Sequence, residues 1–216
     1  EWKREVISRR TLPWEIIKVP RTNIMVISQP DAVDTVGSCL VANLQTGAWS
    51  RFTGWRTRCL GVFGGRVFFG SDDSCVYEME KGGSDNGNLY TCVYLGQHED
   101  LAAPAMQKTV TQMRPVFQTA NPIAPQLSAL ADYDETLTAP PSSVADFPLG
   151  IWDEGLWDSA LWDSGDASVA SAYWVGIGVT GYVIAPLLQM TFGVTPAPRV
   201  ELVAIDAAYH VGALVA

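Results

Sequence analysis

Three tryptophans between residues 150 and 165 recur every five residues, and an aspartate follows each: Trp152-Asp153, Trp157-Asp158 and Trp162-Asp163. An indole buries a large apolar area and carries one N–H donor, while a carboxylate accepts hydrogen bonds or binds cations. A period of five matches neither a helix nor a strand, so neither element would align the indoles on one face. The spacing therefore predicts an irregular loop.

Three kinds of chemistry fit this Trp-Asp loop. Buried indoles with hydrogen-bonded edges would anchor the loop or form a subunit contact, and we favour this interpretation because aromatic side chains dominate interfaces. Exposed indoles would instead stack on sugars while the aspartates bind hydroxyls. A calcium loop is the third interpretation, but the spacing of five misses the alternating Asp-x-Asp-x-Asp ligand pattern.

A second motif, Gly176-Ile-Gly-Val-Thr-Gly181, matches the dinucleotide fingerprint G-x-G-x-x-G, and Glu201 follows it by twenty residues. That fingerprint needs a helix directly after its third glycine. Here Tyr182-Val-Ile-Ala-Pro186 is typical of a strand, so we interpret the glycines as a bend in a strand. We expect no cofactor.

The sequence offers little for hydrolysis. Its two histidines are His98 and His210, and it contains no G-x-S-x-G or H-E-x-x-H motif. The pairs Asp72-Asp73 and Asp132 with Asp134 could serve a glycosidase, but acids in turns are more often turn formers. We expect no catalytic or metal site, and a protein that is not an enzyme.

The four cysteines form no C-x-x-C pair, and each lies in an apolar stretch: Cys39, Cys59, Cys75 and Cys92. Free cysteine behaves as a small buried hydrophobe, so we predict reduced, unmetallated and mostly buried thiols. A disulfide or a metal site is the alternative.

Composition predicts an all-β chain. Hydrophobic residues make up 48% and charged residues 17%, which excludes a disordered chain. Nineteen Gly and 13 Pro suit short strands and many turns. Residues 167–198 carry no charge and are long enough to span a bilayer. Because glycines and prolines interrupt them, we predict two strands joined by a turn and no stable membrane span.

The net charge of −9 is unevenly distributed. Residues 1–66 contain ten Lys and Arg against five acids, giving +5, and residues 67–216 contain four against eighteen, giving −14. The acidic part should repel nucleic acid. The basic part is interpreted as solvated strand faces or, alternatively, as a docking surface for an acidic neighbour.

Residues 38–95 are predicted to form antiparallel strands with turns at Thr46-Gly47, Gly64-Gly65 and Asp72-Asp73. The predicted strands are 39–42, 48–52, 57–63, 66–70 and 75–79. Short strands separated by such turns make a meander of the kind that is stacked in propeller blades.

Further strands are predicted at 108–117, 126–134, 172–180, 182–191, 199–206 and 211–215, which suggests a β-sandwich. Alternation in the first of them places Val110, Gln112 and Arg114 on one face, against Thr111, Met113 and Pro115. The predicted fold is all-β: a propeller-type antiparallel β-meander over residues 1–98, followed by a β-sandwich over residues 99–216. The Trp-Asp loop is inserted at about 146–170.

The order Asn-x-x-Thr-Gly-Ala-Trp-Ser-Arg-Phe-Thr-Gly-Trp at residues 43–55 is followed by a Gly-Gly hairpin, Phe68-Phe-Gly-Ser-Asp-Asp73 and Gly83-Ser-Asp-Asn-Gly87. This order resembles the propeller segment of tail nozzle (hub) proteins, the packaged-DNA-stabilising tail proteins of short-tailed bacteriophages. Segments 12–20 and 24–30 and the Trp-Asp loop are similar in the same sense.

The resemblance implies a structural virion protein that forms a homo-oligomeric, six-fold ring in the tail and is assembled in the cytoplasm of the bacterial host. The ring would contact tail adaptor or portal-ring proteins, retain packaged DNA and conduct it during ejection without binding it specifically. A propeller needs at least about four blades, and the strands before residue 100 suffice for about two. The chain, which begins at Glu1, is therefore expected to be the C-terminal portion of a longer protein or a reduced version of the family.

Two sets of site residues follow from this resemblance. The candidate interface or anchoring residues are Trp49, Trp55, Trp152, Trp157 and Trp162. The acids of the Trp-Asp loop are candidates to line the channel, where they would repel the DNA backbone: Asp153, Glu154, Asp158, Asp163 and Asp166. The alternative function is a carbohydrate-binding or glycan-degrading propeller module of a receptor-recognising tail component, which would keep the loop indoles exposed.

Overall fold

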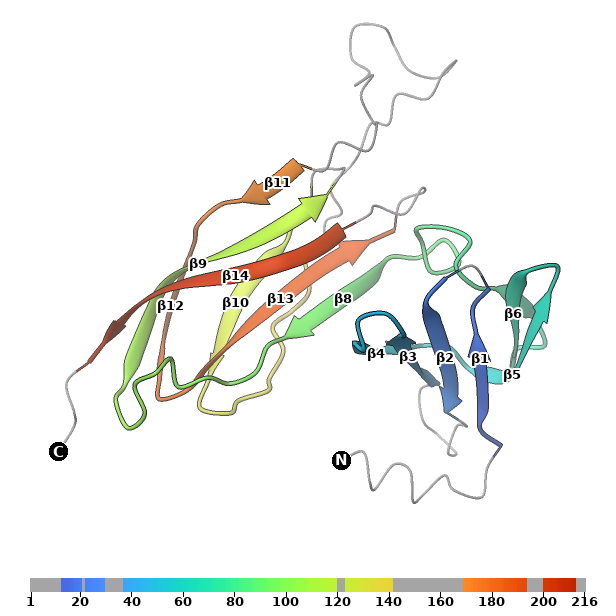
Figure 1. The fold of residues 1–216 in the computed structure, drawn as a ribbon, viewed down its shortest axis with the longest axis horizontal. Helices are drawn as coiled ribbons and strands as arrows, with labels where there is room; N and C mark the ends of the chain where they lie inside the picture. Colours follow the sequence, from blue (N-terminus) through green and yellow to red (C-terminus); the bar gives the residue numbers. More distant parts are fainter. Residues whose placement is uncertain are drawn as a thin grey trace, which may run out of the picture. The chain divides into compact units, whose positions relative to one another are not determined.

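The computed structural model describes residues 13–20, 22–29, 37–119, 123–141, 169–193 and 200–212 of the protein. Over these residues the chain is all-β, as predicted: fourteen strands form four antiparallel sheets, and none of the described residues is helical (Figure 1). Within the described ranges no sheet closes on itself and no propeller is formed.

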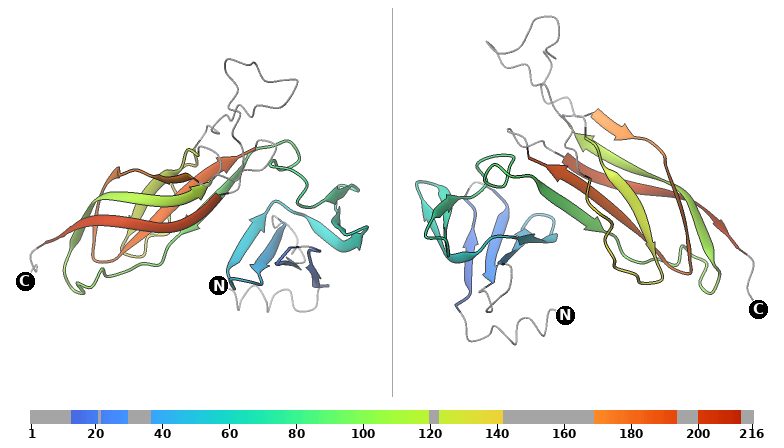
Figure 2. Two further views of the ribbon diagram at one scale, coloured as in Figure 1. Left: turned by 45° about the horizontal axis from the view of Figure 1, so that its top comes forward. Right: turned by 180° about the vertical axis from the view of Figure 1, so that it is seen from behind.

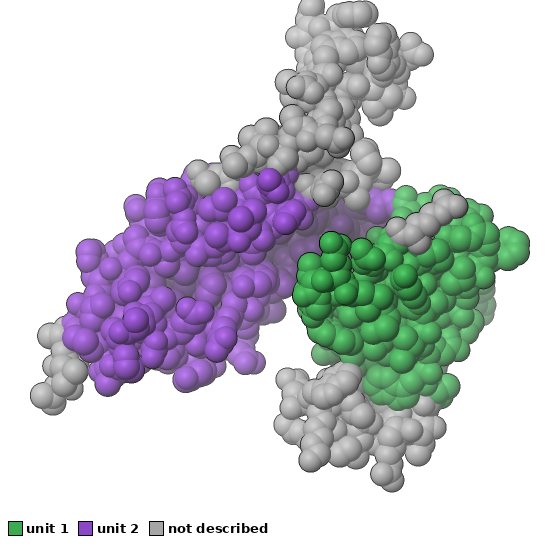
Figure 3. Space-filling view, viewed as in Figure 1, with its two compact units in different colours: residues 1–81 green, residues 82–216 purple. Residues whose placement is uncertain are grey.

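The chain forms two compact units, unit 1 from Glu1–Lys81 and unit 2 from Gly82–Ala216 (Figure 3). The sequence placed the division seventeen residues later, after residue 98. The structure differs because strand β8 (Tyr90–Leu95) pairs with β13 (Ile184–Phe192) of unit 2. That partner lies about a hundred residues away in the chain, beyond what a local turn pattern reveals.

Unit 1 contains a four-stranded meander in the order β1-β2-β3-β4 and a three-stranded sheet in the order β5-β6-β7 (Figure 2). Its strands are β1 (Glu15–Lys18), β2 (Ile24–Gln29), β3 (Ser38–Asn43), β4 (Trp49–Thr53), β5 (Thr57–Phe63), β6 (Arg66–Ser71) and β7 (Val76–Glu78). The predicted antiparallel strands of residues 38–95 and their three turns are confirmed.

Turn chemistry explains where these strands end. The Asn43 side-chain oxygen accepts hydrogen bonds from the N–H groups of Gln45 and Thr46 at 2.9 and 3.2 Å. The β5–β6 hairpin turns at Gly64 and Gly65, whose φ angles of 58° and 77° are both positive, as a two-residue type I′ turn requires.

The two sheets of unit 1 share one hydrophobic core, to which β2 and β3 contribute Val26, Cys39 and Val41, and β6 contributes Val67 and Phe69. Four aromatic rings pack in series through this core: Phe52, Trp55, Phe69 and Tyr77, with successive centroids 5.2, 5.3 and 5.3 Å apart. We call these four residues the aromatic ladder.

Unit 2 also contains two sheets. One has the order β10-β13-β8, and in the other β9 lies between β14 on one side and β11 and β12 on the other. The remaining strands are β9 (Lys108–Thr119), β10 (Gln126–Ala131), β11 (Val169–Ala172), β12 (Val175–Gly181) and β14 (Val200–Val211). Both sheets supply one core, with Val110, Met113 and Phe117 from β9, Leu127 from β10 and Leu188 from β13.

Two features of unit 2 correct the sequence prediction. Residues 199–206 and 211–215 were predicted as separate strands, but a single strand, β14, runs through Val211 and pairs with β9 along its whole length. The predicted alternation in β9 places Gln112 and Arg114 correctly against the buried Met113 and Pro115, but it is wrong for Val110. Val110 and Met113 both face the core, because Thr111 is an extra residue in the ladder between β9 and β14, a β-bulge.

The G-x-G-x-x-G motif lies in strand β12, not at the start of a helix, which confirms its interpretation as a bend. The register of β12 against β9 shifts between Gly176 and Val179, and Gly178 within this bulge has a φ of 72°. A left-handed conformation at a bulge favours glycine.

We predict that Phe69→Ala lowers the free energy of unfolding of unit 1 by about 3–5 kcal/mol, because it removes the centre of the aromatic ladder from a buried site. Hydrogen exchange of β3 and β6 during urea unfolding would measure the change. The matched control is Phe63→Ala, since this ring is 77% exposed. It should stay within about 0.5 kcal/mol of the wild type. Equal losses in the two variants would contradict the packing described for Phe69.

We also predict that Gly178→Ala destabilises unit 2 by about 1 kcal/mol, since an added Cβ strains the left-handed backbone although it meets no atom within 4 Å. Gly176→Ala is the control in the same strand, with equal room and no positive φ. Thermal unfolding should show Gly176→Ala unchanged or slightly more stable. If both variants lost stability equally, backbone strain would not explain Gly178.

Candidate functional site

The structure describes two of the predicted interface or anchoring residues. Trp49 begins β4 and keeps 60% of its surface exposed. Trp55 lies in the aromatic ladder, stacked on Phe69. The other candidates, Trp152, Trp157 and Trp162, lie outside the described residues, as do the proposed channel-lining acids Asp153, Glu154, Asp158, Asp163 and Asp166. Their roles stay predictions.

The backbone around Trp55 is closely packed. A Cβ added to Gly37 would come within 2.4 Å of the Trp55 carbonyl oxygen, so only glycine fits opposite it. The Gly37 carbonyl in turn accepts a hydrogen bond from Gly54 N–H at 2.8 Å. Trp55 therefore anchors the end of β4 inside unit 1. Trp49, on the same strand, offers its indole to solvent, which is typical of a residue that forms contacts.

Four basic side chains of unit 1 lie beside acidic partners in the same unit. Asp72 lies 3.2 Å from Arg56 and 4.0 Å from Arg58, and Glu78 lies 3.3 Å from both Arg66 and Lys81. The four basic side chains are all more than half exposed, so each pair contributes little to stability. Their effect is to mask charge over β5, β6 and β7.

The division into units changes the charge asymmetry seen in the sequence. Counted by unit, residues 1–81 contain eleven basic groups against nine acids, giving +2, and residues 82–216 contain three against fourteen, giving −11. Asp72 and Glu78, which the sequence count assigned to the acidic part, lie beside the arginines. The surface of unit 1 is thus of mixed charge, and the acidic character of the protein belongs to unit 2.

One acidic turn is coupled to the aromatic ladder. The Tyr77 hydroxyl donates a 2.6 Å hydrogen bond to Asp73 and thereby raises the pKa of Tyr77 from 10.0 to about 12. The same bond, together with a 3.0 Å bond from Cys75 N–H, lowers the pKa of Asp73 below 3.8. Asp73 is exposed and Tyr77 is half-buried, so the coupling orders the turn before β7 without adding a buried charge.

The paired carboxylates considered for glycosidase chemistry are used in turns. Asp132 Oδ1 accepts hydrogen bonds from Tyr182 and Val183 N–H at 2.7 and 3.3 Å, and Asp134 accepts one from Thr136 N–H at 2.9 Å. These contacts agree with the interpretation of these acids as turn formers.

The prediction of mostly buried cysteines is wrong. No disulfide joins any two of the four, but only Cys39 is buried, where its sulfur lies 3.3 Å from the Thr57 hydroxyl oxygen. Cys59, Cys75 and Cys92 are exposed. An apolar stretch does not fix which face of a strand meets the core, and in β5 and β8 most side chains face outward.

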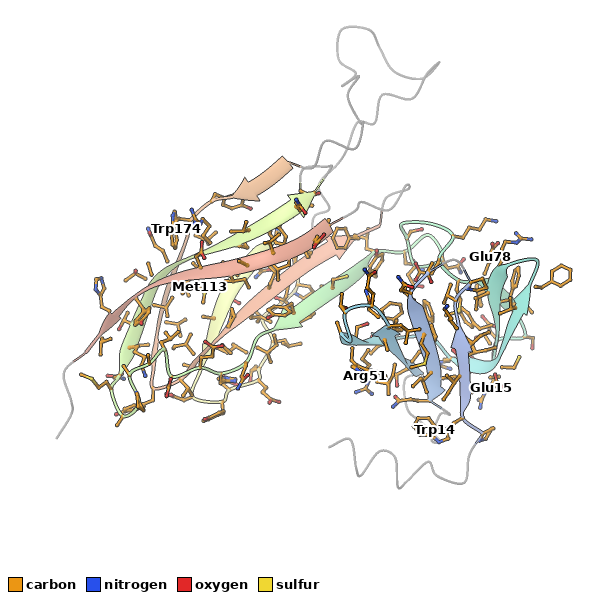
Figure 4. The ribbon with its side chains drawn as sticks, viewed as in Figure 1. Trp14, Glu15, Arg51, Glu78, Met113 and Trp174 are labelled. Carbon is orange, nitrogen blue, oxygen red and sulfur yellow. The ribbon has the colours of Figure 1, made fainter. Side chains whose placement is uncertain are left out.

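Unit 2 contains a row of interacting side chains that the sequence did not reveal. Arg114 of β9 donates to Asp206 of β14 through Nε and Nη2, at 3.0 and 2.5 Å, and its guanidinium carbon lies 5.0 Å from the centroid of the Trp174 ring. Trp174 lies in the segment that joins β11 to β12 (Figure 4). The sequence signal, an aromatic residue two positions before a strand glycine, is too common to identify such a row.

Among the described residues, no three His, Cys, Asp or Glu side chains gather as metal ligands would. Over the same ranges no helix is long and apolar enough to cross a membrane. Residues 167–198 include β12 and β13, which are joined by a short turn, as predicted, and also the short strand β11, which makes three strands where two were predicted.

Comparison with known proteins found no match among family models, curated proteins or solved structures.

We predict that Asp73→Asn lowers the pKa of Tyr77 from about 12 toward 10.0, because it removes the acceptor carboxylate. Ultraviolet difference titration would measure this shift, with Tyr77→Phe identifying the step that belongs to Tyr77. The coupling stabilises the folded state above the unfolded pKa of Asp73, near 3.8, and is lost as pH rises through about 12. Asp72→Asn, which removes the neighbouring acid, should leave the titration unchanged. A wild-type Tyr77 that titrates near pH 10 would contradict the hydrogen bond.

Proposed function

We propose that the protein is a structural virion protein of a bacteriophage tail, a ring-forming nozzle or hub subunit that retains packaged DNA and conducts it during ejection. The observation that carries this proposal is the segment from Asn43 to Trp55 with the hairpins that follow it. Its sequence resembles that of tail nozzle proteins, and its residues have structural roles in unit 1.

The residues that carry the resemblance form turns and part of the core in unit 1. Asn43 shapes the β3–β4 turn, Gly47 adopts a φ of 73° in it, and Trp55 occupies the aromatic ladder. Gly64 and Gly65 close the next hairpin. The quoted motif therefore consists of residues that a meander needs for its turns and its core, as expected of a structural module.

The finer architecture belongs to the same proposal. The two meander sheets of unit 1 have the antiparallel, sequential strand order of propeller blades, and we assign them as blades of a propeller that further sheets complete. The two sheets of unit 2, which share one core, support the β-sandwich expected from the sequence.

The charge distribution suits a conduit. Unit 2 has a net charge of −11, and an acidic wall repels the phosphate backbone, so DNA can slide without being held. Unit 1, with mixed charge and the exposed Trp49, would contact neighbouring copies and the tail adaptor or portal-ring proteins.

Native mass spectrometry and electron microscopy of the full chain test this proposal. We predict a closed ring of one chain type, six-fold by resemblance, with acids toward the lumen and Arg51, Arg56 and Arg58 away from it. Duplex DNA should not bind the ring tightly even at low salt. An acidic lumen offers few Lys and Arg side chains to neutralise phosphates and release the counterions of the DNA. A protein that stays monomeric at high concentration, or a lumen lined by these arginines, would contradict the proposal.

A further inference from the structure

Strand register determines which side chains meet on the outer face of the sheet formed by β9, β11, β12 and β14. Residues directly opposite in antiparallel strands lie on the same face. Arg114 pairs with Asp206, and Val175 pairs with Met113, so Trp174 comes opposite Arg114 from the other side. Because Met113 is buried in the core, Arg114 and its two neighbours form a row on the outer face.

The interactions within this row hold its members in place. Nε and Nη2 of Arg114 both donate to Oδ2 of Asp206. Among the described residues no donor reaches Oδ1 of Asp206. The guanidinium lies over the Trp174 ring, in a cation–π contact that fixes the indole from one side. Trp174 nevertheless keeps 46% of its surface exposed, so the indole is ordered and accessible at once.

The next row along the sheet has two residues with little or no side chain and one polar side chain. It consists of Gly176, Gln112 and Ala208, which are opposite one another in β12, β9 and β14. A Cβ at Gly176 would meet no atom within 4 Å, so the space beside the indole is open. Gln112 is exposed and offers an amide with both donors and an acceptor.

We propose that this face binds a neutral saccharide, with one pyranose ring stacked on Trp174. The C–H face of a pyranose is apolar and weakly positive, and it is attracted to the negative face of an aromatic ring. The Gln112 amide would donate to and accept from hydroxyls near the indole. Asp206 Oδ1, on the far side of Arg114 from Trp174, would accept from hydroxyls of a neighbouring sugar unit. Gly176, which follows Trp174 closely in the chain, leaves room beside the indole.

The surrounding chemistry favours a neutral sugar over other ligands. The net charge of −11 in unit 2 disfavours acidic glycans and nucleic acid. Trp and Arg are enriched in protein interfaces but Asp is depleted, and here the carboxylate of Asp206 lies in the row next to the exposed Gln112, so both offer hydrogen bonds to hydroxyl groups. The assignment uses no residue of the Trp-Asp loop and does not depend on the proposed ring.

Isothermal titration of the full chain with neutral hexasaccharides of glucose, galactose and mannose, to about 10 mM, tests the proposal. We expect at least one to bind, and a hyaluronan hexasaccharide not to bind. Trp174→Ala should weaken the binding by about tenfold or more, while Trp49→Ala, which removes an even more exposed indole from unit 1, should not change it. If Trp174→Ala proves misfolded by circular dichroism, Gln112→Ala at this exposed strand position should still weaken binding.

Three outcomes would overturn the assignment. They are the absence of binding by every neutral hexasaccharide, unchanged binding by a folded Trp174→Ala variant, and tighter binding of hyaluronan than of the neutral sugars. A change in the mass of the assembly in Trp174→Ala without a change in sugar binding would identify the row as a subunit contact, and would equally exclude the saccharide site.

Discussion

Pairing of β9 along both of its edges is the constraint on which unit 2 depends. Its buried side supplies Val110, Met113 and Phe117 to the core, and its outer side places Arg114 between Trp174 and Asp206. If the register between β9 and β14 shifted by one residue, the core-facing side chains of β9 would move to the outer face and the outer ones to the core. The bulge at Thr111 opposes such a slip, because the bulged residue fits one position in the ladder.

Unit 1 is organised by shorter-range interactions. Its hairpins bring the aromatic ladder together from residues 52 to 77, and the Tyr77–Asp73 bond ties the last ring to the turn before it. The salt bridges of Asp72 and Glu78 follow the same hairpins. The core, the turns and the charge pairs thus come from one stretch of chain. Asp72 and Glu78 partly neutralise basic groups that the count from the sequence had placed in a separate, basic part.

This difference in range decides what could be predicted from sequence. The strands of residues 38–79 and their turns were found because Gly64-Gly65 and Asp72-Asp73 act on their immediate neighbours. The pairing of β8 with β13 was missed, as was the burial of Lys108, whose ammonium donates to the Tyr182 carbonyl at 2.6 Å. Both depend on chain segments at least 74 residues apart, and nothing in the local pattern encodes such a partner.

The candidate sites show the same limit. The exposed Trp49 and the ladder residue Trp55 are six residues apart in one motif, yet one faces solvent and the other the core. Sequence identified both as contact residues but could not separate their roles, since that depends on which side of β4 the second sheet covers. The row at Arg114 requires three segments in register and was not visible at all.

The distance in sequence between β9 and β14 also orders events during synthesis. Unit 1 needs only near neighbours, so it can fold while the rest of the chain is still being made. Strand β9, by contrast, must wait for about eighty further residues before β14 emerges to cover its edge. At about 5–20 residues per second that delay lasts several seconds, during which the open edge of β9 is accessible to other nascent chains. We therefore expect unit 2 to determine the yield of soluble protein, with slow translation at low temperature or chaperones that shield strand edges raising it.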